Sequence, residues 1–319
     1  MKFQAVLTCY LFARSLANPG LPFSGLIEGV GELFSPEILK QLPNLVSLDP
    51  PLKLNVSRRW LHDSPKTVRD YLSRSLISVC SHAKSLSFEC LCNEKYSDIH
   101  AIDDPYLQAT VLVAVHKPDR QIVVSYRPAT KLENWLTNLN YDWVPFRRGH
   151  VHQGFFNHFK ATQKRSEAVV IHLLEKYTHH SLLVTGYSLG GATALIAVPY
   201  FKEILDAHED RRHFSAILYA SPRVGDAEFV SMIYHLKVPV TRYSNHNDII
   251  SHIPPRSFGY THAGVEVHEY STSSGTSKLR ICSQSFDEDP TCAWHSVPFL
   301  SAARHIAPLG KPIPVPQFC

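Results

Sequence analysis

One stretch near the middle of the chain restricts the fold more than any other. It begins with an apolar run at 182–187, long enough for a buried strand, and continues at 189–196 with leucine and alanine at helical spacing. Between the two lies the string G-Y-S-L-G, centred on Ser188. Glycine on both sides of a serine is typical of a sharp strand-to-helix turn, because a side chain there would collide with the backbone. The stretch predicts a nucleophile elbow rather than a structural Gly/Ser turn, with the Ser188 hydroxyl above the sheet edge and unpaired helix N–H groups beside it.

Strands and helices alternate through much of the remaining chain. Apolar runs predict strands at 110–115, 121–126, 182–187, 215–220 and 238–243, with a last hairpin within 264–281. Helical spacing predicts helices at 66–80, 154–177 and 227–236, and another after the elbow that Pro199 is expected to kink or end. This order indicates one α/β domain over 60–319, with a mostly parallel central sheet and helices on both faces.

The N-terminus is typical of a secreted protein. Residues 1–17 combine a basic start, a short apolar core and a small-x-small end, which indicate a signal peptide rather than a buried strand. Residues 18–59 lack a sustained period and end in a dibasic pair, so we expect a propeptide or an N-terminal arm that stays attached. No other stretch approaches the length of a membrane span. The 32 basic and 28 acidic residues leave a charge of +4, too small to indicate nucleic-acid binding.

Cysteine usage agrees with secretion. Once Cys9 is assigned to the signal peptide, the remaining cysteines are even in number, as expected for disulfides: Cys80, Cys90, Cys92, Cys282, Cys292 and Cys319. Their spacing does not suit a zinc site, and we expect no metal and no organic cofactor. Asn55 begins an N-x-S sequence and is a candidate glycan acceptor.

An elbow serine needs an acid and a histidine base, which follow it in the order Ser, Asp/Glu, His. Asp248 lies just past the carboxyl end of the strand expected at 238–243, where sites on open sheets form. Its alternative role is an Asx turn that only closes the strand. The histidines after this acid are His252, His262, His268, His295 and His305. Of these, His252 is too close in sequence to face Asp248 easily.

Several strings resemble the class 3 lipases, the filamentous-fungal triacylglycerol lipase family. V-T-G-Y-S-L-G-G-A-T-A around Ser188 resembles the family's elbow, although Tyr187 stands where the family usually has histidine. N-D-I-I-x-x-I-P-P around Asp248 resembles its acid motif, and C-A-W-H-S-V-P around His295 is similar to its histidine loop. The resemblance implies an α/β-hydrolase fold and a triad of Ser188, Asp248 and His295, with His305 as the alternative base.

The resemblance also implies an oxyanion hole and a lid. The Leu189 N–H would be one donor, and the string R-P-A-T-K-L-E-N-W is similar to a family string whose third residue, here Ala129, supplies the other N–H. Pro128 and Ala129 replace the family's glycine and its serine or threonine, so a hydroxyl donor is absent. The lid helix would lie within 132–139, with one apolar face. Periodicity alone does not separate a lid from an ordinary core helix, and without the resemblance it favours the core helix. The face consists of Leu132, Trp135, Leu136 and Leu139.

The same resemblance implies the pairing of the cysteines and the activity. It implies the disulfides Cys80–Cys319 and Cys282–Cys292, which would leave Cys90 to pair with Cys92. We expect a secreted, monomeric serine hydrolase that cleaves acylglycerol esters at an oil–water interface. Two alternatives remain open: an esterase for soluble or aryl (feruloyl-type) esters, and a catalytically weak lipid-binding relative, to which Pro128 and Ala129 point.

Overall fold

The computed structural model describes residues 95–129, 140–271, 277–282, 288–296 and 300–305. The expected signal peptide at 1–17, the segment 18–59, the helix at 66–80 and the lid residues Leu132, Trp135 and Leu136 lie outside these ranges. Also outside them are Asn55, Cys80, Cys90, Cys92 and Cys319. The expectations that concern these residues therefore stay predictions.

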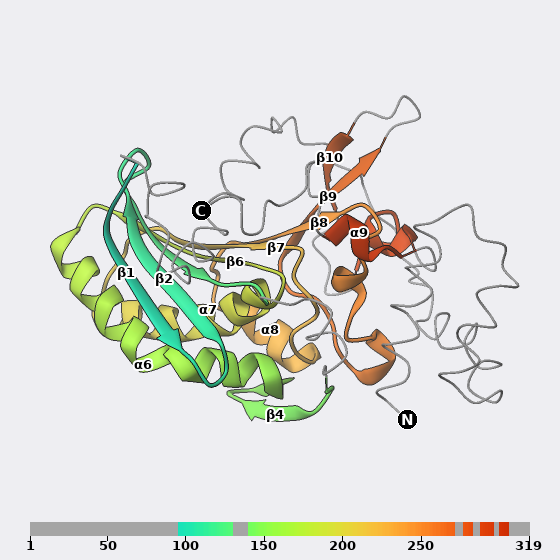
Figure 1. Ribbon diagram of the computed structural model, residues 1–319, viewed down its shortest axis with the longest axis horizontal. Coiled ribbons are helices and arrows are strands. Elements are labelled where there is room, and N and C mark those ends of the chain that lie inside the picture. Colours follow the sequence, from blue (N-terminus) through green and yellow to red (C-terminus); the bar gives the residue numbers. More distant parts are fainter. Residues whose placement is uncertain (1–94, 130–139, 272–276, 283–287, 297–299, 306–319) are drawn as a thin grey trace, which may run out of the picture.

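An eight-stranded sheet forms the centre of the molecule, in the order β1-β2-β3-β6-β7-β8-β9-β10 (Figure 1). Neighbours from β3 to β9 pair in parallel, and antiparallel pairs flank them on both sides. The strands are β1 Tyr96–Asp104, β2 Ala109–His116, β3 Gln121–Tyr126, β6 Ser181–Tyr187, β7 Phe214–Tyr219, β8 Val240–Asn245, β9 Val265–Ser271 and β10 Ser277–Ile281. Both expected hairpins, β2–β3 and β9–β10, are confirmed. A separate two-stranded sheet, β4 (Trp143–Phe146) with β5 (Gly149–His152), was not foreseen from the sequence.

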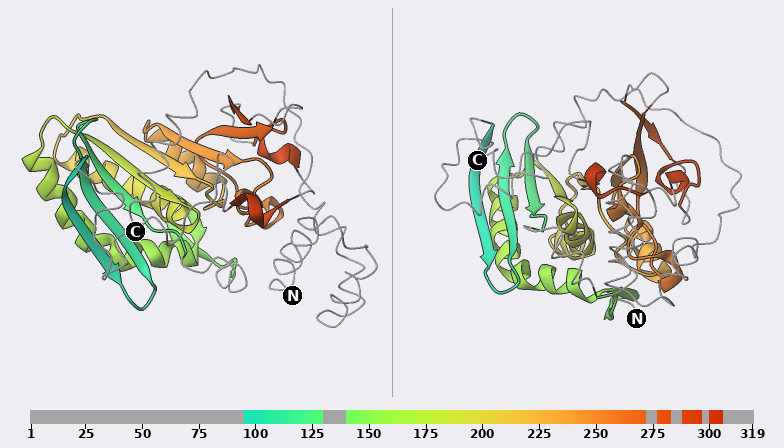
Figure 2. Two further views of the ribbon diagram at one scale, coloured as in Figure 1. Left: turned by 45° about the horizontal axis from the view of Figure 1, so that its top comes forward. Right: turned by 45° about the vertical axis from the view of Figure 1, so that its right-hand side comes forward.

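Parallel strands need crossover connections; the one from β8 to β9 contains only short 3-10 helices, and three α-helices lie on the other three. They are α6 (Gln153–Lys176) before β6, α7 (Leu189–Ala207) after it, and α8 (Ala227–His235) between β7 and β8. The first two contact each other and lie on one face of the sheet (Figures 1 and 2). Among the described helices, none combines the length and apolar character that crossing a membrane would require.

Both faces of the sheet are buried. Along β2, Val111 and Val113 belong to the main core cluster, whereas Leu112 and Ala114 belong to a separate cluster. All four are fully buried, although successive side chains of a strand point to opposite faces. Burial on both faces is what a mostly parallel α/β sheet requires, as the alternating sequence pattern predicts.

Pro199 does not end the elbow helix, in contrast to one of the two outcomes expected from the sequence. The helix α7 continues through it to Ala207. Proline removes one backbone donor and crowds the preceding turn. However, α7 is buried over most of its length and packs on α6, β6 and β7. Tertiary packing therefore keeps the helix continuous where local preference disfavours it.

Candidate active site

Ser188 stands at the junction of β6 and α7, where the sequence predicts the elbow. Its φ of 57° and ψ of −124° lie outside the regions that residues with side chains favour. Its N–H donates to the carbonyl of Tyr219, the last residue of β7, at 2.8 Å. This hydrogen bond helps to hold the strained backbone, so that the serine lies at the carboxyl end of the sheet.

Gly186 and Gly190 permit the turn because backbone approaches backbone there. A Cβ on Gly186 would lie 2.2 Å from the carbonyl of Gly190, and a Cβ on Gly190 would lie 2.0 Å from the carbonyl oxygen of Tyr126. No side chain fits at either distance, which confirms the reason for the glycines. The second contact also brings the end of β3 against the first turn of α7.

The two expected oxyanion donors lie on the segments that meet at this contact. Leu189 opens α7, and the first N–H groups of a helix have no partner within the helix. Arg127 follows β3, and its buried side chain donates to the carbonyl of Gln108, which anchors the segment that leads to Ala129. The geometry is compatible with a pair of N–H donors, and the role of Ala129 stays a prediction.

Asp248 lies in the turn after β8, as expected from the sequence, and its side chain is almost fully buried. One carboxylate oxygen accepts from the Ile250 N–H at 2.9 Å. The other lies 2.8 Å from Nδ1 of His305. That histidine is itself only 2% exposed, so a buried acid–imidazole pair is present.

His305 ends the short helix α9 (Ala302–His305), which several hydrogen bonds fasten to the sheet. The Ser301 N–H donates to the Asn247 carbonyl at 2.7 Å. The Asn245 amide donates to the Arg304 carbonyl, and the Tyr187 hydroxyl donates to the His305 carbonyl. The last carbonyls of a helix have no partner within it, and these two side chains supply one to each.

Tyr187 connects the histidine to the elbow. It precedes Ser188 in the chain, and the centroids of its ring and the His305 ring lie 5.1 Å apart. Burial, and then the negative charges of Asp248 and Glu269, raise the pKa of Tyr187 well above its ordinary value. The phenol therefore stays protonated and remains a hydrogen-bond donor to the carbonyl of His305.

The structure does not bring His295 to Asp248, and on this point it departs from the interpretation favoured from the sequence. His295 is exposed on the 3-10 helix η3 (Ala293–Ser296), whereas the acid pairs with the alternative base, His305. The physical reason is a tether: the chain is fixed three residues before His295 by the disulfide Cys282–Cys292.

The sequence contains a signal that would favour His305 as the base. The order Ser, Asp, His admits both histidines, so order alone cannot decide. The apolar run at 297–300 precedes residues 301–305, which contain neither glycine nor proline. Such a run favours entry into the core, where a catalytic imidazole must pair with a buried acid.

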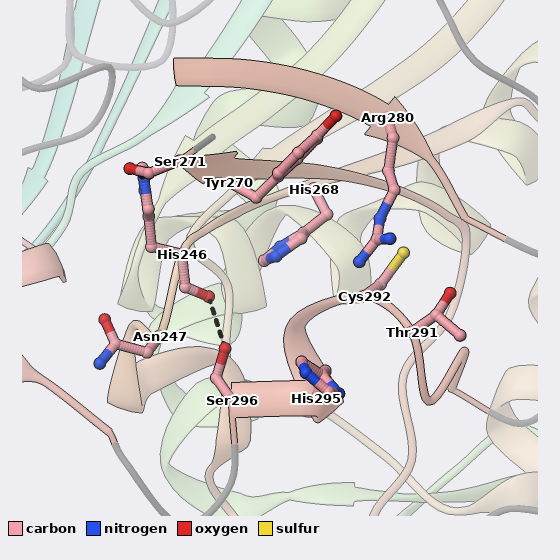
Figure 3. Close-up of a pocket in the computed structure, with 10 residues that line it drawn as sticks. All are labelled: His246, Asn247, His268, Tyr270, Ser271, Arg280, Thr291, Cys292, His295 and Ser296. Carbon is pink, nitrogen blue, oxygen red and sulfur yellow. Dashed lines mark hydrogen bonds between the residues drawn. The ribbon is translucent and has the colours of Figure 1, made fainter. Parts of the chain in front are cut away.

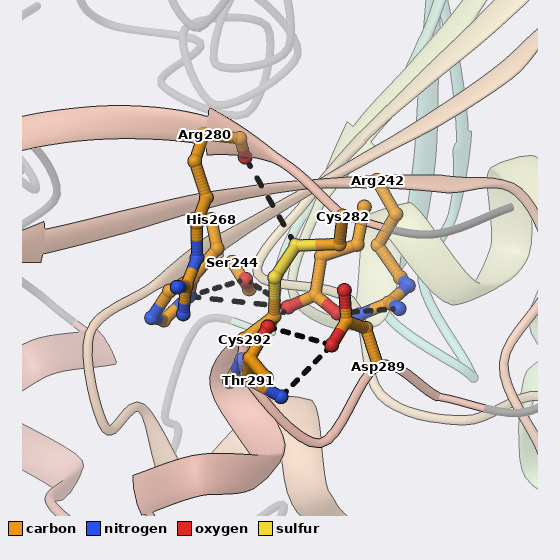
Figure 4. Close-up of a disulfide and its surroundings, with 10 residues drawn as sticks. Arg242, Ser244, His268, Arg280, Cys282, Asp289, Thr291 and Cys292 are labelled. Atoms are coloured by element: carbon orange, nitrogen blue, oxygen red, sulfur yellow. Dashed lines mark hydrogen bonds and ion pairs between the residues drawn. A yellow bond between two sulfur atoms is a disulfide. The ribbon is translucent and has the colours of Figure 1, made fainter. Parts of the chain in front are cut away.

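A buried ion pair holds the described residues 288–296 and 300–305, which we call the histidine arm. Arg223 donates from Nε and Nη2 to the two carboxylate oxygens of Glu288 at 2.6 and 2.8 Å. Burial alone would raise the pKa of Glu288, but the basic groups around it, Arg223 foremost, together hold the pKa well below its usual range. The disulfide adds a covalent link from the end of β10 to η3 (Figure 4).

One cluster within the described ranges has the composition of a metal site. Glu266, Cys282 and Cys292 bring their donor atoms within 4.8 Å of one another. The two sulfur atoms are joined in the disulfide, so they offer no thiolate, which is the form that binds a metal. The donor set therefore does not fit an ion.

Comparison with known proteins finds lipases among the relatives of this chain. The class 3 lipase family matches residues 123–258. The lipase of Rhizomucor miehei is 29% identical over 204 residues, which cover 62% of this chain and 54% of that protein. The secreted mono- and diacylglycerol lipase 1 of Fusarium solani is 31% identical over 159 residues, 48% of this chain and 45% of that protein. The chain thus spans about half the length of these curated relatives.

A solved structure shows that the fold is shared over most of the chain. The propeptide complex of the Rhizomucor miehei lipase superposes with a TM-score of 0.69 at 23% identity, covering 83% of this chain and 91% of that one. Sheet order, elbow and acid position define an α/β-hydrolase. Within that fold, residues 123–258 match the class 3 lipase family.

Proposed function

We propose that the protein is a serine hydrolase that cleaves acylglycerol esters, with Ser188 as nucleophile, His305 as base and Asp248 as the acid that orients the base. The observation that carries the proposal is the buried Asp248–His305 pair beside a strained elbow serine. The family and the curated lipases among the relatives support the substrate class.

The residues divide the chemistry in a defined way. Asp248 accepts a hydrogen bond from Nδ1 of His305, which leaves Nε2 as the basic atom. Nε2 removes the proton of Ser188 as its oxygen attacks the ester carbonyl, and later returns the proton to the leaving alcohol. The N–H groups of Leu189 and Ala129 stabilise the oxyanion. Water then releases the acid from the acyl-enzyme by the same steps.

Access to the nucleophile requires a movement. Ser188 is 2% exposed, and its hydroxyl makes no hydrogen bond to any described residue. A catalytic hydrogen bond often forms only when substrate is bound. An amphipathic lid at 132–139, expected from the sequence, would open at a lipid surface and admit the ester.

The protein is proposed to act outside the cell as a monomer. The Cys282–Cys292 disulfide is typical of oxidising compartments, and the Fusarium relative is named a secreted lipase. The proposed signal peptide at 1–17 and the propeptide or arm at 18–59 complete this assignment. The Rhizomucor lipase structure is a propeptide complex, which supports the proposal that residues 18–59 are a propeptide.

The test is the rate of tributyrin hydrolysis measured through the solubility limit of the substrate. We expect a rise in rate when droplets form, and loss of the activity in Ser188→Ala. The matched control is Ser231→Ala, the same change at a half-buried serine on α8, which should keep the rate. A smooth saturating curve below the limit, lost in Ser188→Ala, would instead identify an esterase for soluble substrates. Equal rates in wild type and Ser188→Ala would refute catalysis at this site.

A further inference from the structure

A cavity of about 510 Å³ lies beside the turn that carries Asp248, the proposed catalytic acid. Its walls come from that turn, from β9 and β10, and from the histidine arm (Figure 3). Neither Ser188 nor His305 lines it. His295, the histidine that the sequence favoured as base, instead lines this cavity together with His246, His268 and Arg280. Four basic side chains from four separate segments converge on one space.

The side chains of the cavity lining that can carry charge near neutral pH are all basic. None of the lining residues is an aspartate or a glutamate, and most of the others offer hydroxyl or amide groups. The buried carboxylates of β9 have partners behind the lining, and one oxygen of Glu266 also lies 3.9 Å from Nδ1 of His268. Glu269 accepts from the Tyr243 hydroxyl, and Glu266 accepts from the Ser244 hydroxyl and from Arg242. A ligand in the cavity therefore meets donors and positive charge.

The hydrogen bonds of His268 fix which of its nitrogen atoms is protonated. Its Nδ1 lies 2.9 Å from the Ser244 hydroxyl, which gives its own hydrogen to Glu266, so Nδ1 must donate. Burial, and then Arg280, lower the pKa of His268 well below its ordinary value. Arg280 therefore carries the permanent charge of the cavity, and an entering anion would favour a proton on Nε2 of His268.

We propose that this cavity binds a phosphate ester, carried either by the head group of an anionic lipid or by a soluble glycerol phosphate. A guanidinium surrounded by imidazoles and hydroxyls suits an oxyanion with several acceptor atoms. The volume falls in the range of small-molecule sites, about 300–1,000 Å³, and so has room for an ester rather than a bare ion.

The position of the cavity gives such a ligand a role at the catalytic end of the sheet. His246 and Asn247 line the cavity and lead directly into Asp248. The Asn247 carbonyl also accepts from the Ser301 N–H, which fastens α9. A lipid head group bound here would anchor the catalytic end of the molecule on an anionic surface. This site does not depend on the proposed hydrolysis.

The test uses the full chain with Ser188→Ala, so that no ester is cleaved and binding is measured alone. Calorimetric titration with sn-glycerol 3-phosphate should show binding, and glycerol should show none. Adding Arg280→Gln should weaken the binding about tenfold or more, because a charge-assisted contact is lost. The matched control is Lys278→Gln, the same charge change at an exposed residue of β10 outside the cavity, which should stay within about twofold because solvent screens exposed charges.

A second variant protects the test against misfolding, because Arg280 is only half-exposed. His295→Gln changes an exposed lining residue and should also weaken binding, by a smaller factor. Sedimentation with phosphatidylcholine vesicles, with and without phosphatidic acid, separates the two sources. Arg280-dependent binding to the acidic vesicles assigns a lipid head group, and Arg280-dependent binding of the soluble ester alone assigns a soluble ligand. Absent binding, or equal binding in all variants, would overturn the proposal.

Discussion

The two halves of the proposed catalytic centre are built in different ways. The elbow is made of backbone: Ser188 is held by a hydrogen bond to the neighbouring strand, and Gly190 touches the carbonyl of Tyr126. The histidine arm is fastened mostly by side chains and by one covalent link. These attachments include Arg223–Glu288, Cys282–Cys292, Asn245 to the Arg304 carbonyl and Tyr187 to the His305 carbonyl, and backbone hydrogen bonds of Ser301 add to them.

The elbow is therefore specified by a short stretch of sequence, whereas the position of the arm depends on residues far apart in the chain. An elbow needs a strand, two small residues and a helix, all within a short stretch of sequence. Apart from the disulfide, the side-chain contacts of the arm join distant residues, such as Asp248 and His305, 57 positions apart, and Tyr187 and His305, 118 positions apart. Substitutions should therefore affect the two halves in different ways.

The largest expected effect distinguishes the two histidines. His305→Ala should lower kcat about 10⁴-fold or more, because the general base of the serine is lost. His295→Ala, the matched change, should leave kcat within about twofold. Steady-state hydrolysis of a soluble ester by both variants measures this. The opposite ranking would return the base to His295.

Glu288→Gln should weaken the arm while it leaves the elbow intact. Removal of one charge from a buried pair leaves Arg223 uncompensated, and such changes lower the free energy of unfolding by about 3–5 kcal/mol. The control is Glu203→Gln, whose partner Arg147 lies in an exposed pair, where about 0–1 kcal/mol is expected. Urea unfolding of both variants makes the comparison, and similar losses would contradict it.

Gly190→Ala should destabilise the elbow while it leaves the arm unchanged. The new Cβ would meet the Tyr126 carbonyl oxygen at 2.0 Å, and neither backbone can move freely, so we expect a loss of about 3 kcal/mol or more. Gly154→Ala is the control, because its nearest neighbours are atoms of the His152 ring at 3.1 and 3.3 Å. Thermal unfolding should show a large shift for the first variant and a small one for the second.

Tyr187→Phe should affect the alignment of the base without removing it. The loss of one neutral hydrogen bond to the His305 carbonyl is worth about 1–1.5 kcal/mol, so kcat should fall roughly tenfold while KM changes little. Tyr177→Phe removes a surface hydroxyl that donates to Asp98 and should leave both constants unchanged. If KM rises and kcat does not, Tyr187 does not position the base.

The last prediction concerns how the free energy of unfolding depends on pH through His252, a buried histidine that lies near the arm. Burial, and then Arg223, lower the pKa of His252 to about 3, so the folded protein keeps this ring neutral. Its unfolded pKa is near 6.5, so the unfolded state gains the proton first and stability falls as pH drops from about 6.5 towards 3. The slope for this group approaches about 1.4 kcal/mol per pH unit.

His252→Leu should reduce the slope of the unfolding free energy against pH below about 6.5, because one of the buried histidines that take up a proton on unfolding is gone. The exposed His179→Leu should leave the dependence as it is in the wild type. Urea unfolding between pH 7 and pH 5, at about half-unit steps, resolves the two slopes. Equal slopes in His252→Leu and wild type would mean that His252 is not the group responsible.

Much of the fold was predictable because its signals are local. The hairpin over 109–126, the long helix α6 and the strand–elbow–helix unit each follow from periodicity and turn residues. Pro199 was harder to interpret, because only the packing of α7 on its neighbours keeps that helix continuous. The small sheet β4–β5 gave no usable signal, since its strands are four residues each.

The sequence by itself identified the nucleophile and the acid proposed for this protein. Ser188 and Asp248 each follow a strand of the central sheet, and the position of a residue just past such a strand is a local property of the chain. The base is different, since any histidine after Asp248 satisfies the order. Only the tertiary structure separates His295 from His305, because the disulfide and the Arg223–Glu288 pair hold one segment of the arm at the cavity, while side chains of β6 and β8 hold the other against Asp248.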